Sequence, residues 1–140
     1  MTYADDVKHF MELAGQKVRT EPTVLTDMEK WQRFEYLNEE FSEMKKALAA
    51  LKKATEYNDK NAIRDALTEL FDAYLDIVYI ALGSAHACGF PVNEGWDRVH
   101  ASNIAKFPGG VAVRDENNKV VKPAGWTPPD LRGLMFPPKH

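Results

Sequence analysis

The sequence predicts an all-α fold: a four-helix-type bundle followed by a short C-terminal β-hairpin and a proline-rich arm. Apolar residues recur at steps of three and four along much of residues 1–107, helix-capping residues stand where these patterns start, and prolines gather after residue 122. A chain of 140 residues can bury a core of its own. We therefore expect one helical domain over residues 1–107. Residues 108–140 are expected to form a hairpin and an extended arm that pack on this domain or on a neighbouring subunit.

The first two helices have clear boundaries in the sequence. Residues 3–14 place apolar side chains along one side and end at Gly15, a residue that favours the end of a helix. Thr26 and Glu29 have the spacing of a capping box, in which each side chain bonds the backbone N–H of the other residue. A long second helix is expected from there to about residue 55.

A glycine and a proline separate the third helix from the fourth. The Asn-Asp pair at 58–59 supplies an N-cap for the third helix, which is expected to run to Cys88 and to stop at Gly89. Pro91 suits the first turn of a fourth helix, which is expected to end near Phe107.

Beyond the fourth helix the pattern changes from helical to extended. Valines on both sides flank the polar segment 115–118, which favours a small β-hairpin. Five prolines follow after residue 122, so an extended arm is expected there.

Composition and charge exclude several kinds of partner. The net charge is −3 and the pI is about 5.8, so the chain lacks the basic field of a protein that binds duplex nucleic acid. The most apolar run, residues 73–82, contains Asp76 and is too short to span a bilayer. The N-terminus does not resemble a signal peptide, and a single cysteine, Cys88, suits a reducing compartment. We expect a cytoplasmic protein with no nucleic-acid and no membrane partner.

Four acidic residues form one stripe of the predicted third helix. Asp65, Glu69, Asp72 and Asp76 are spaced by four, three and four residues. The stripe runs through the most apolar part of the chain, where a carboxylate is costly to bury unless it is paired, hydrogen-bonded or bound to a cation. The pattern therefore predicts bound divalent metal, with Glu69, Asp72 and Asp76 as candidate ligands.

The second helix carries a matching acidic group, Glu39, Glu40 and Glu43. Glu40 and Glu43 are one turn apart and can bind the same ion. The short loop near residues 56–59 makes the second and third helices antiparallel neighbours, and a rise of about 1.5 Å per residue places both acidic groups at nearly the same level. Ligands that are all oxygen favour Mg²⁺, for which Mn²⁺ can substitute.

Two other interpretations of these acids compete with a divalent-metal site. A di-iron carboxylate bundle would need Glu-x-x-His on two helices, and His86 stands ten residues beyond Asp76, too far along the helix. A solvated helix face explains residues 39–43 when they are taken alone. It explains Asp72 and Asp76 less well, because both lie among aromatic and β-branched residues.

Hydrogen-bond donors gather near the end of the fourth helix. Asn103 and Lys106 are one turn apart, Ser102 and His100 lie beside them, and Lys122 adds positive charge from beyond the hairpin. Carboxylates that hold metal on one side and such donors on the other suit a polyphosphate. A local hydrogen bond on the helix explains His100 equally well.

Taken together, these residues resemble the signature of the MazG-like all-α nucleoside triphosphate pyrophosphohydrolases, which include phosphoribosyl-ATP pyrophosphohydrolases and dimeric dUTPases. That signature is E-x-x-E, a spacer, and E-x-x-D. In this chain Glu40-x-x-Glu43 is followed after 25 residues by Glu69-x-x-Asp72. The likeness to the short phage and bacterial branch extends to V-H-x-S-N-x-x-K at 99–106 and K-V-x-K-P at 119–123.

The resemblance implies hydrolysis of a nucleoside triphosphate, usually a deoxynucleotide, to the monophosphate and pyrophosphate. It also implies a bacterial cytoplasm, or the host cytoplasm if the protein is phage-encoded. Glu39 is expected to orient or deprotonate the attacking water. The residues expected to bind Mg²⁺ are Glu40, Glu43, Asp72 and Asp76, with Glu69 as an alternative. The residues expected to bind phosphate are Asn103, Lys106, Lys122, His100 and Ser102.

The resemblance also suggests where the nucleobase lies and how the chain assembles. Phe10 and Gln16 would lie over the nucleotide, and Trp31 or Phe34 would stack on the base, although ordinary core packing explains each aromatic residue as well. The apolar helices and the arm favour a homodimer or homotetramer with a site completed across an interface. Two further functions stay open: a non-catalytic helical bundle that binds nucleotides or controls assembly and, among enzymes, a phosphoribosyl-ATP pyrophosphohydrolase.

Overall fold

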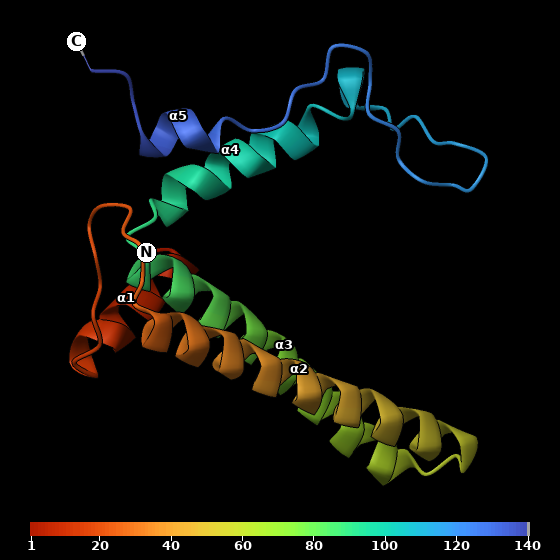
Figure 1. The fold of residues 1–140 in the computed structure, drawn as a ribbon. Helices are drawn as coiled ribbons and strands as arrows, with labels where there is room; N and C mark the ends of the chain where they lie inside the picture. The colour runs from red at the N-terminus through yellow and green to blue at the C-terminus, as the bar shows by residue number, and fades with distance from the viewer. Residues whose placement is uncertain (140) are drawn as a thin grey trace.

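A long antiparallel helical hairpin forms the body of the protein (Figure 1). In the computed structural model, which describes residues 1–139, α2 spans Asp27–Glu56 and α3 spans Lys60–Ala87. The predicted capping box opens α2, and Asp59 caps α3. The all-α prediction is therefore confirmed, and the two helices that carry the candidate metal ligands lie side by side.

Alanines supply the most deeply buried positions between these two helices. Ala47 and Ala54 of α2 and Ala66 and Ala73 of α3 are all buried. Small side chains allow two helix backbones to approach closely, because the distance between packed helices depends on the side chains at the contact. The side chains of one helix can then reach the other.

The hydrophobic core lies at one end of the hairpin. There α1 (Tyr3–Leu13) packs on α3, and the buried residues of the cluster are Val7, Met11, Leu25 and Ala87. The ring of His86 is buried in this region and its Nε2 lies 2.7 Å from the carbonyl oxygen of Ala4. This region fixes the end of α3 from which the next helix starts.

The chain bends by 119° between α3 and α4 (Val92–Ile104). Within residues 1–139 the helix pairs in substantial contact are α2 with α3, α1 with α3, α3 with α4, and α4 with α5. The long helices therefore do not close into a four-helix bundle inside one chain, because the bend directs α4 away from α2 (Figure 1). No single helix among these residues is long and apolar enough to cross a membrane; α3 and α4 meet that test only as a bent pair.

The predicted C-terminal hairpin is wrong. Residues 111–121 contain a single antiparallel bridge, between Arg114 and Val120, and no strand is formed in the described part of the chain. The side chain of Asp115 accepts hydrogen bonds from the backbone of Asn117 and Lys119, which makes a tight turn but not a ladder. The arm does contain a short helix that the sequence did not suggest, α5 (Leu131–Met135), which packs on α4.

Candidate active site

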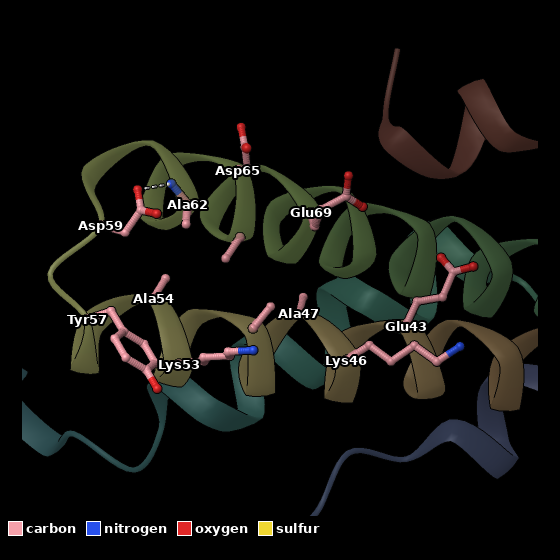
Figure 2. A pocket seen from close by; sticks show the side chains of 12 residues that line it. Glu43, Lys46, Ala47, Lys53, Ala54, Tyr57, Asp59, Ala62, Asp65 and Glu69 are labelled. Atoms are coloured by element: carbon pink, nitrogen blue, oxygen red, sulfur yellow. Dashed lines mark hydrogen bonds between the residues drawn. The ribbon is translucent and has the colours of Figure 1, made fainter.

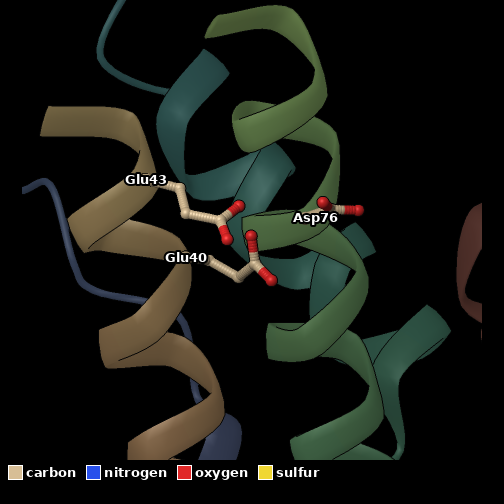
Figure 3. A group of neighbouring side chains, drawn as sticks. All are labelled: Glu40, Glu43 and Asp76. Atoms are coloured by element: carbon tan, nitrogen blue, oxygen red, sulfur yellow. The ribbon is translucent and has the colours of Figure 1, made fainter. Parts of the chain in front are cut away.

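Three carboxylates from two helices converge at the middle of the hairpin. One carboxylate oxygen each of Glu40, Glu43 and Asp76 lies within 4.8 Å of the other two. Figure 3 shows Glu40 and Glu43 reaching from α2 toward α3, where Asp76 lies at the same level. The antiparallel register predicted from the short loop therefore brings these acids together.

Glu40 has the most unfavourable electrostatic surroundings of the three. Burial, together with the nearby charges of Asp76 and Glu43, raises the pKa of Glu40 above its ordinary value. Its Oε2 atom is buried and has no hydrogen-bond partner within residues 1–139. A buried, unpaired carboxylate oxygen is costly unless a cation neutralises it.

The carboxylate of Asp76 shares this environment. Burial is again the main cause that raises its pKa, and the charge of Asp72 adds to the effect. Asp72 is exposed and also contributes to the raised pKa of Glu40, so it lies within electrostatic reach of both. The structure therefore adds Asp72 to the rim of the three-carboxylate group and does not place it among the three that converge.

Glu69 lies on the other side of Glu43, along a groove between the two helices. This groove has a volume of about 660 Å³, Glu43 and Glu69 line it, and it continues toward the hairpin loop (Figure 2). Alanines of both helices make up much of its lining. Asp65, the first acid of the predicted stripe, lines the same groove further from the three carboxylates.

Glu39 lies on the exposed side of the acidic group. It lines a hollow of about 430 Å³ with Glu43 and Ser42, and its charge contributes to the raised pKa of Glu40. An exposed carboxylate beside the candidate ligands is accessible to water, which is what the role predicted for Glu39 requires.

The predicted phosphate-binding residues gather at the far end of α4. The Nζ atom of Lys106 donates to Asn103 Oδ1 (3.1 Å), and both Lys106 and Lys122 lie over the ring of Trp126, at 5.3 and 4.7 Å from its centroid. The hydroxyl of Ser102 donates to the carbonyl of Thr127 (3.2 Å), so it joins α4 to the arm.

His100, the remaining predicted phosphate residue, is exposed on α4. In the structure α4 runs apart from the hairpin that carries the carboxylates (Figure 1). The residues predicted to hold metal and those predicted to bind phosphate therefore form two separate groups within one chain.

The four predicted nucleobase residues lie in three different environments. Phe10 packs edge-to-face on Tyr79, with ring centroids 5.5 Å apart. The rings of Trp31 and Phe34 lie side by side on α2, with their centroids 6.0 Å apart, and each residue is 60% exposed. Gln16 lines a hollow of about 270 Å³ at the end of the hairpin. The structure does not gather them into one base pocket.

The sequence did not predict that Trp126 contacts both Lys106 and Lys122. Its Nε1 donates to the carbonyl of Ser102 (2.7 Å), which fixes the ring beneath the two lysines. The position of Trp126, four residues after Lys122, could have indicated a contact between these two residues, because lysines commonly lie over tryptophan faces. It gave no indication that Lys106, twenty residues earlier, contacts the same ring.

The sequence of the helical part decides the family. A model of the phosphoribosyl-ATP pyrophosphohydrolase family, PRA-PH, matches residues 7–103, well over half of the chain. The chain belongs to the PRA-PH family. A comparison with curated proteins finds no match. The resemblance to MazG-like and PRA-PH pyrophosphohydrolases is thereby confirmed.

Membership of the PRA-PH family implies a nucleotide pyrophosphohydrolase that uses a divalent metal. The donor set fits such an ion. All three converging groups are carboxylates, the ligands that hard divalent cations prefer, and one of their oxygens is buried without a partner. The family match ends at Asn103, so Lys106, Lys122 and Trp126 lie outside it.

Proposed function

We propose that this PRA-PH family member hydrolyses a nucleoside triphosphate, preferably a deoxynucleotide, to the monophosphate and pyrophosphate with Mg²⁺. The observation that carries the proposal is the convergence of Glu40, Glu43 and Asp76 within 4.8 Å across two helices. The raised pKa values of Glu40 and Asp76 support it, because the fold holds these acids together at an electrostatic cost that a cation relieves.

Each residue has a defined part in this proposal. Glu40, Glu43 and Asp76 hold the metal, with Asp72 and Glu69 as further ligands on either side. A bound Mg²⁺ ion supplies positive charge to the phosphate oxygens and lowers the pKa of water. Glu39 orients the attacking water and accepts its proton. The donors at the end of α4 lie apart from the carboxylates of their own chain, so in this proposal they bind the phosphate chain across an interface between copies and neutralise the charge that develops on it.

A panel of triphosphates tests the proposal. Pyrophosphate release is measured for ribo- and deoxynucleotides with Mg²⁺, with Mn²⁺, and with a chelator. We expect hydrolysis that depends on metal, and we expect Glu43→Ala and Asp76→Ala each to lower kcat/KM by on the order of 100-fold or more. Glu116→Ala, in the turn of the arm, is the matched control and should leave hydrolysis unchanged.

Two results would contradict this reading in different ways. Hydrolysis that survives both substitutions would remove the metal role from these residues. Binding of nucleotides without hydrolysis of any of them would favour a non-catalytic bundle.

Phosphoribosyl-ATP is the second candidate substrate, because the matching family carries that description. The same assay decides between the two. A kcat/KM for phosphoribosyl-ATP above that for every deoxynucleoside triphosphate would replace the preferred substrate and leave the metal site as proposed.

We also propose that the chain works as a homodimer or homotetramer. Large apolar side chains are exposed along both long helices; those at least 48% exposed are Met28, Trp31, Phe34, Leu67, Phe71, Tyr74, Leu75 and Val78. Contiguous exposure of this kind marks an interaction surface. A second copy that covers it would keep the two helices rigid and hold their carboxylates in place.

A further inference from the structure

A polar hollow beside the start of α2 carries an excess of positive charge. Its volume is about 270 Å³, and its lining includes Gln16, Lys17, Glu29, Gln32, Arg33 and Tyr36. The carboxylate of Glu29 is paired with Arg19, whose Nη2 lies 2.9 Å away. Lys17 and Arg33 form no ion pair within residues 1–139. The hollow therefore presents donors that no acid of the described chain occupies.

The half-buried Arg33 has no structural partner to explain it. An arginine near a helix C-terminus often donates to the last carbonyl groups. Here the carbonyl oxygens of residues 84–88 each accept a hydrogen bond from another group. Arg19 supplies two of these donors, its main-chain N–H (3.1 Å) and its guanidinium (2.7 Å), and the main-chain N–H of Thr23 supplies a third. The guanidinium of Arg33 is left for a ligand.

Arg33 lies in the same seam between α2 and α3 as the candidate metal ligands. Arg33 precedes Glu40 by seven residues, and Gly83 follows Asp76 by seven, so each pair is about 10 Å and nearly two full turns apart on one face of its helix. Arg33 accordingly meets Gly83 across the seam, and a Cβ on Gly83 would lie 3.1 Å from Arg33 Nη1. The missing side chain of this glycine makes room for the guanidinium between the helices.

Tyr36 connects this hollow to the acidic group. It lines the hollow of Arg33 and also the hollow of about 430 Å³ that Glu39 and Glu43 line. Its ring centroid lies 5.7 Å from the guanidinium carbon of Arg33. A sugar and a base that extend from a phosphate at Glu43 would thus pass Tyr36 and reach Arg33.

The donors and acceptors of the hollow fit one base better than the others. A guanidinium carries five donors in a planar fork and no acceptor. Guanine presents two neighbouring acceptors, O6 and N7, to such a fork, whereas adenine places an amino donor beside its N7. The side-chain amides of Gln16 and Gln32 add acceptors as well as donors, which suits a base edge, since a phosphate only accepts.

We propose that Arg33 determines base specificity by binding the O6 and N7 atoms of a guanine. This inference rests on the proposed function and names the base of its substrate. The nucleotide lies along α2, with its α-phosphate at Glu40, Glu43 and Asp76 and its base in the hollow of Arg33. Adenine is disfavoured there, because its amino group would meet the donors of the guanidinium.

A nucleotide panel with one atom changed tests this contact. Hydrolysis is measured for the four deoxynucleoside triphosphates and for 7-deaza-dGTP, in which a carbon replaces N7. We expect wild-type kcat/KM for dGTP to exceed that for dATP and that for 7-deaza-dGTP by about 10-fold each. Arg33→Gln should remove both differences by lowering only the value for dGTP. Arg33→Lys, which keeps the charge but not the fork, should behave like Arg33→Gln.

The outcomes separate this inference from the proposed function. Equal values for dGTP and 7-deaza-dGTP in the wild type overturn the contact, even if the variants do not fold. A fall by the same factor for all four triphosphates in Arg33→Gln also overturns it and gives Arg33 a role that does not depend on the base. A wild type that hydrolyses no triphosphate overturns the proposed function itself. Arg64→Gln, at an exposed position of α3, is the matched control and should leave every ratio unchanged.

Binding of the monophosphates gives a readout that does not depend on hydrolysis. Equilibrium dialysis with Mg²⁺ compares dGMP with dAMP. We expect the wild type and Arg64→Gln to bind dGMP about 10-fold more tightly than dAMP, and we expect Arg33→Gln to bind both equally. A wild-type ratio near one, or binding of neither nucleotide, overturns the inference.

Discussion

Glu40 carries the greatest electrostatic cost in the candidate site. Its carboxylate is half-buried, the charges of four nearby acids raise its pKa, and one of its oxygens has no partner within residues 1–139. Such a residue lowers the stability of the metal-free fold, since its charged form is favoured more in water than in the protein. The metal ion proposed for this site would relieve that cost.

Replacing Glu40 by its neutral isostere should therefore stabilise the metal-free protein. We expect Glu40→Gln to raise the free energy of unfolding at pH 7 by about 1 kcal/mol, or about 3 °C in Tm, because the buried like charge is removed. The same variant should lose most of the stabilisation that Mg²⁺ gives to the wild type. Thermal scans with and without Mg²⁺ measure both effects, and Glu116→Gln is the control. A fall in Tm without metal would contradict the expectation.

The pH dependence of the free energy of unfolding should reflect the titration of Glu40 and Asp76. Burial and neighbouring charge raise the pKa of Glu40 and of Asp76, so in the metal-free protein the folded state binds more protons than the unfolded state. The contribution of these two acids to the stability of the folded state is fully present below their ordinary pKa values of 4.5 and 3.8. It is lost as the pH rises through their raised pKa values. Asp5 and Glu29 act in the opposite direction, because hydrogen bonds lower the pKa of each.

A variant isolates this effect from the rest of the titration. The difference in Tm between Glu40→Gln/Asp76→Asn and the wild type, both without metal, should be near zero well below pH 3.8 and should grow toward neutral pH in favour of the variant. Denaturation curves at a series of pH values measure it. A difference that is constant with pH would show that neither acid has a raised pKa.

The sequence could place acids at one level but could not say which of them converge. Counting residues from the loop predicts that Glu40 and Glu43 meet the stripe of α3. The rotation of α3 about its axis decides that Asp76 faces them while Asp72 and Glu69 lie at the sides, and this rotation depends on packing along the whole hairpin. The contact between Lys106 and Trp126 could not be predicted for a similar reason, because it joins two segments that no local sequence pattern relates.

At the scale of elements, Gly89 sets the direction of α4. It adopts a left-handed φ of 73°, and a Cβ at this position would collide with the backbone carbonyl of Glu21. Two separate causes therefore exclude other residues: the dihedral angle and the close approach of the loop.

A comparison of two glycines separates these causes. Gly15 has nearly the same φ, 71°, but nothing lies within 4 Å of the place that its Cβ would occupy. We expect Gly15→Ala to cost about 1 kcal/mol and Gly89→Ala to cost at least about 2 kcal/mol in the free energy of unfolding. Urea denaturation measures both values. Equal costs would show that the contact with the loop has no energetic weight.

Helix starts and ends were predictable, whereas the angle between helices was not. The capping box of Thr26 and Glu29 and the N-cap of Asp59 act through bonds within a few residues, so the sequence shows them directly. The 119° bend depends on hydrogen bonds between the end of α3 and a loop some seventy residues earlier. The expectation of a four-helix bundle did not include these long-range bonds. The expected hairpin is reduced to one bridge, between Arg114 and Val120, beside a turn that the side chain of Asp115 closes.

At the scale of the whole molecule, the single chain leaves an extended apolar surface in contact with solvent. Phe71 and Leu75 on α3 are 63% and 53% exposed, and α2 presents Trp31 and Phe34 on its surface. Burying this surface by association stabilises the protein, by about 25 cal/mol for each Å² of apolar area buried. Assembly and stability are then linked, so that both should depend on protein concentration.

Removing one aromatic side chain from this surface should shift the assembly toward the 15.9 kDa monomer. We expect Phe71→Ser to raise the dissociation constant by on the order of tenfold or more, because a central apolar contact is lost and a hydroxyl must be buried. Sedimentation equilibrium measures the change. Tyr3→Ser, at an 81% exposed position of α1, is the control and should associate as the wild type does. A wild type that is monomeric at high concentration would contradict the proposed assembly.

The hydrogen bonds between residues 16–25 and the end of α3 have an evolutionary consequence. Two of these bonds come from the main-chain N–H groups of Arg19 and Thr23, which any residue but proline supplies. Three residues are constrained by more than their backbone: Arg19 donates from its guanidinium to Ala87 O (2.7 Å), Leu25 is buried in the core, and Gly89 has no room for a side chain. Relatives that keep the same angle of α4 should therefore retain these three residues and vary at the exposed positions of the loop.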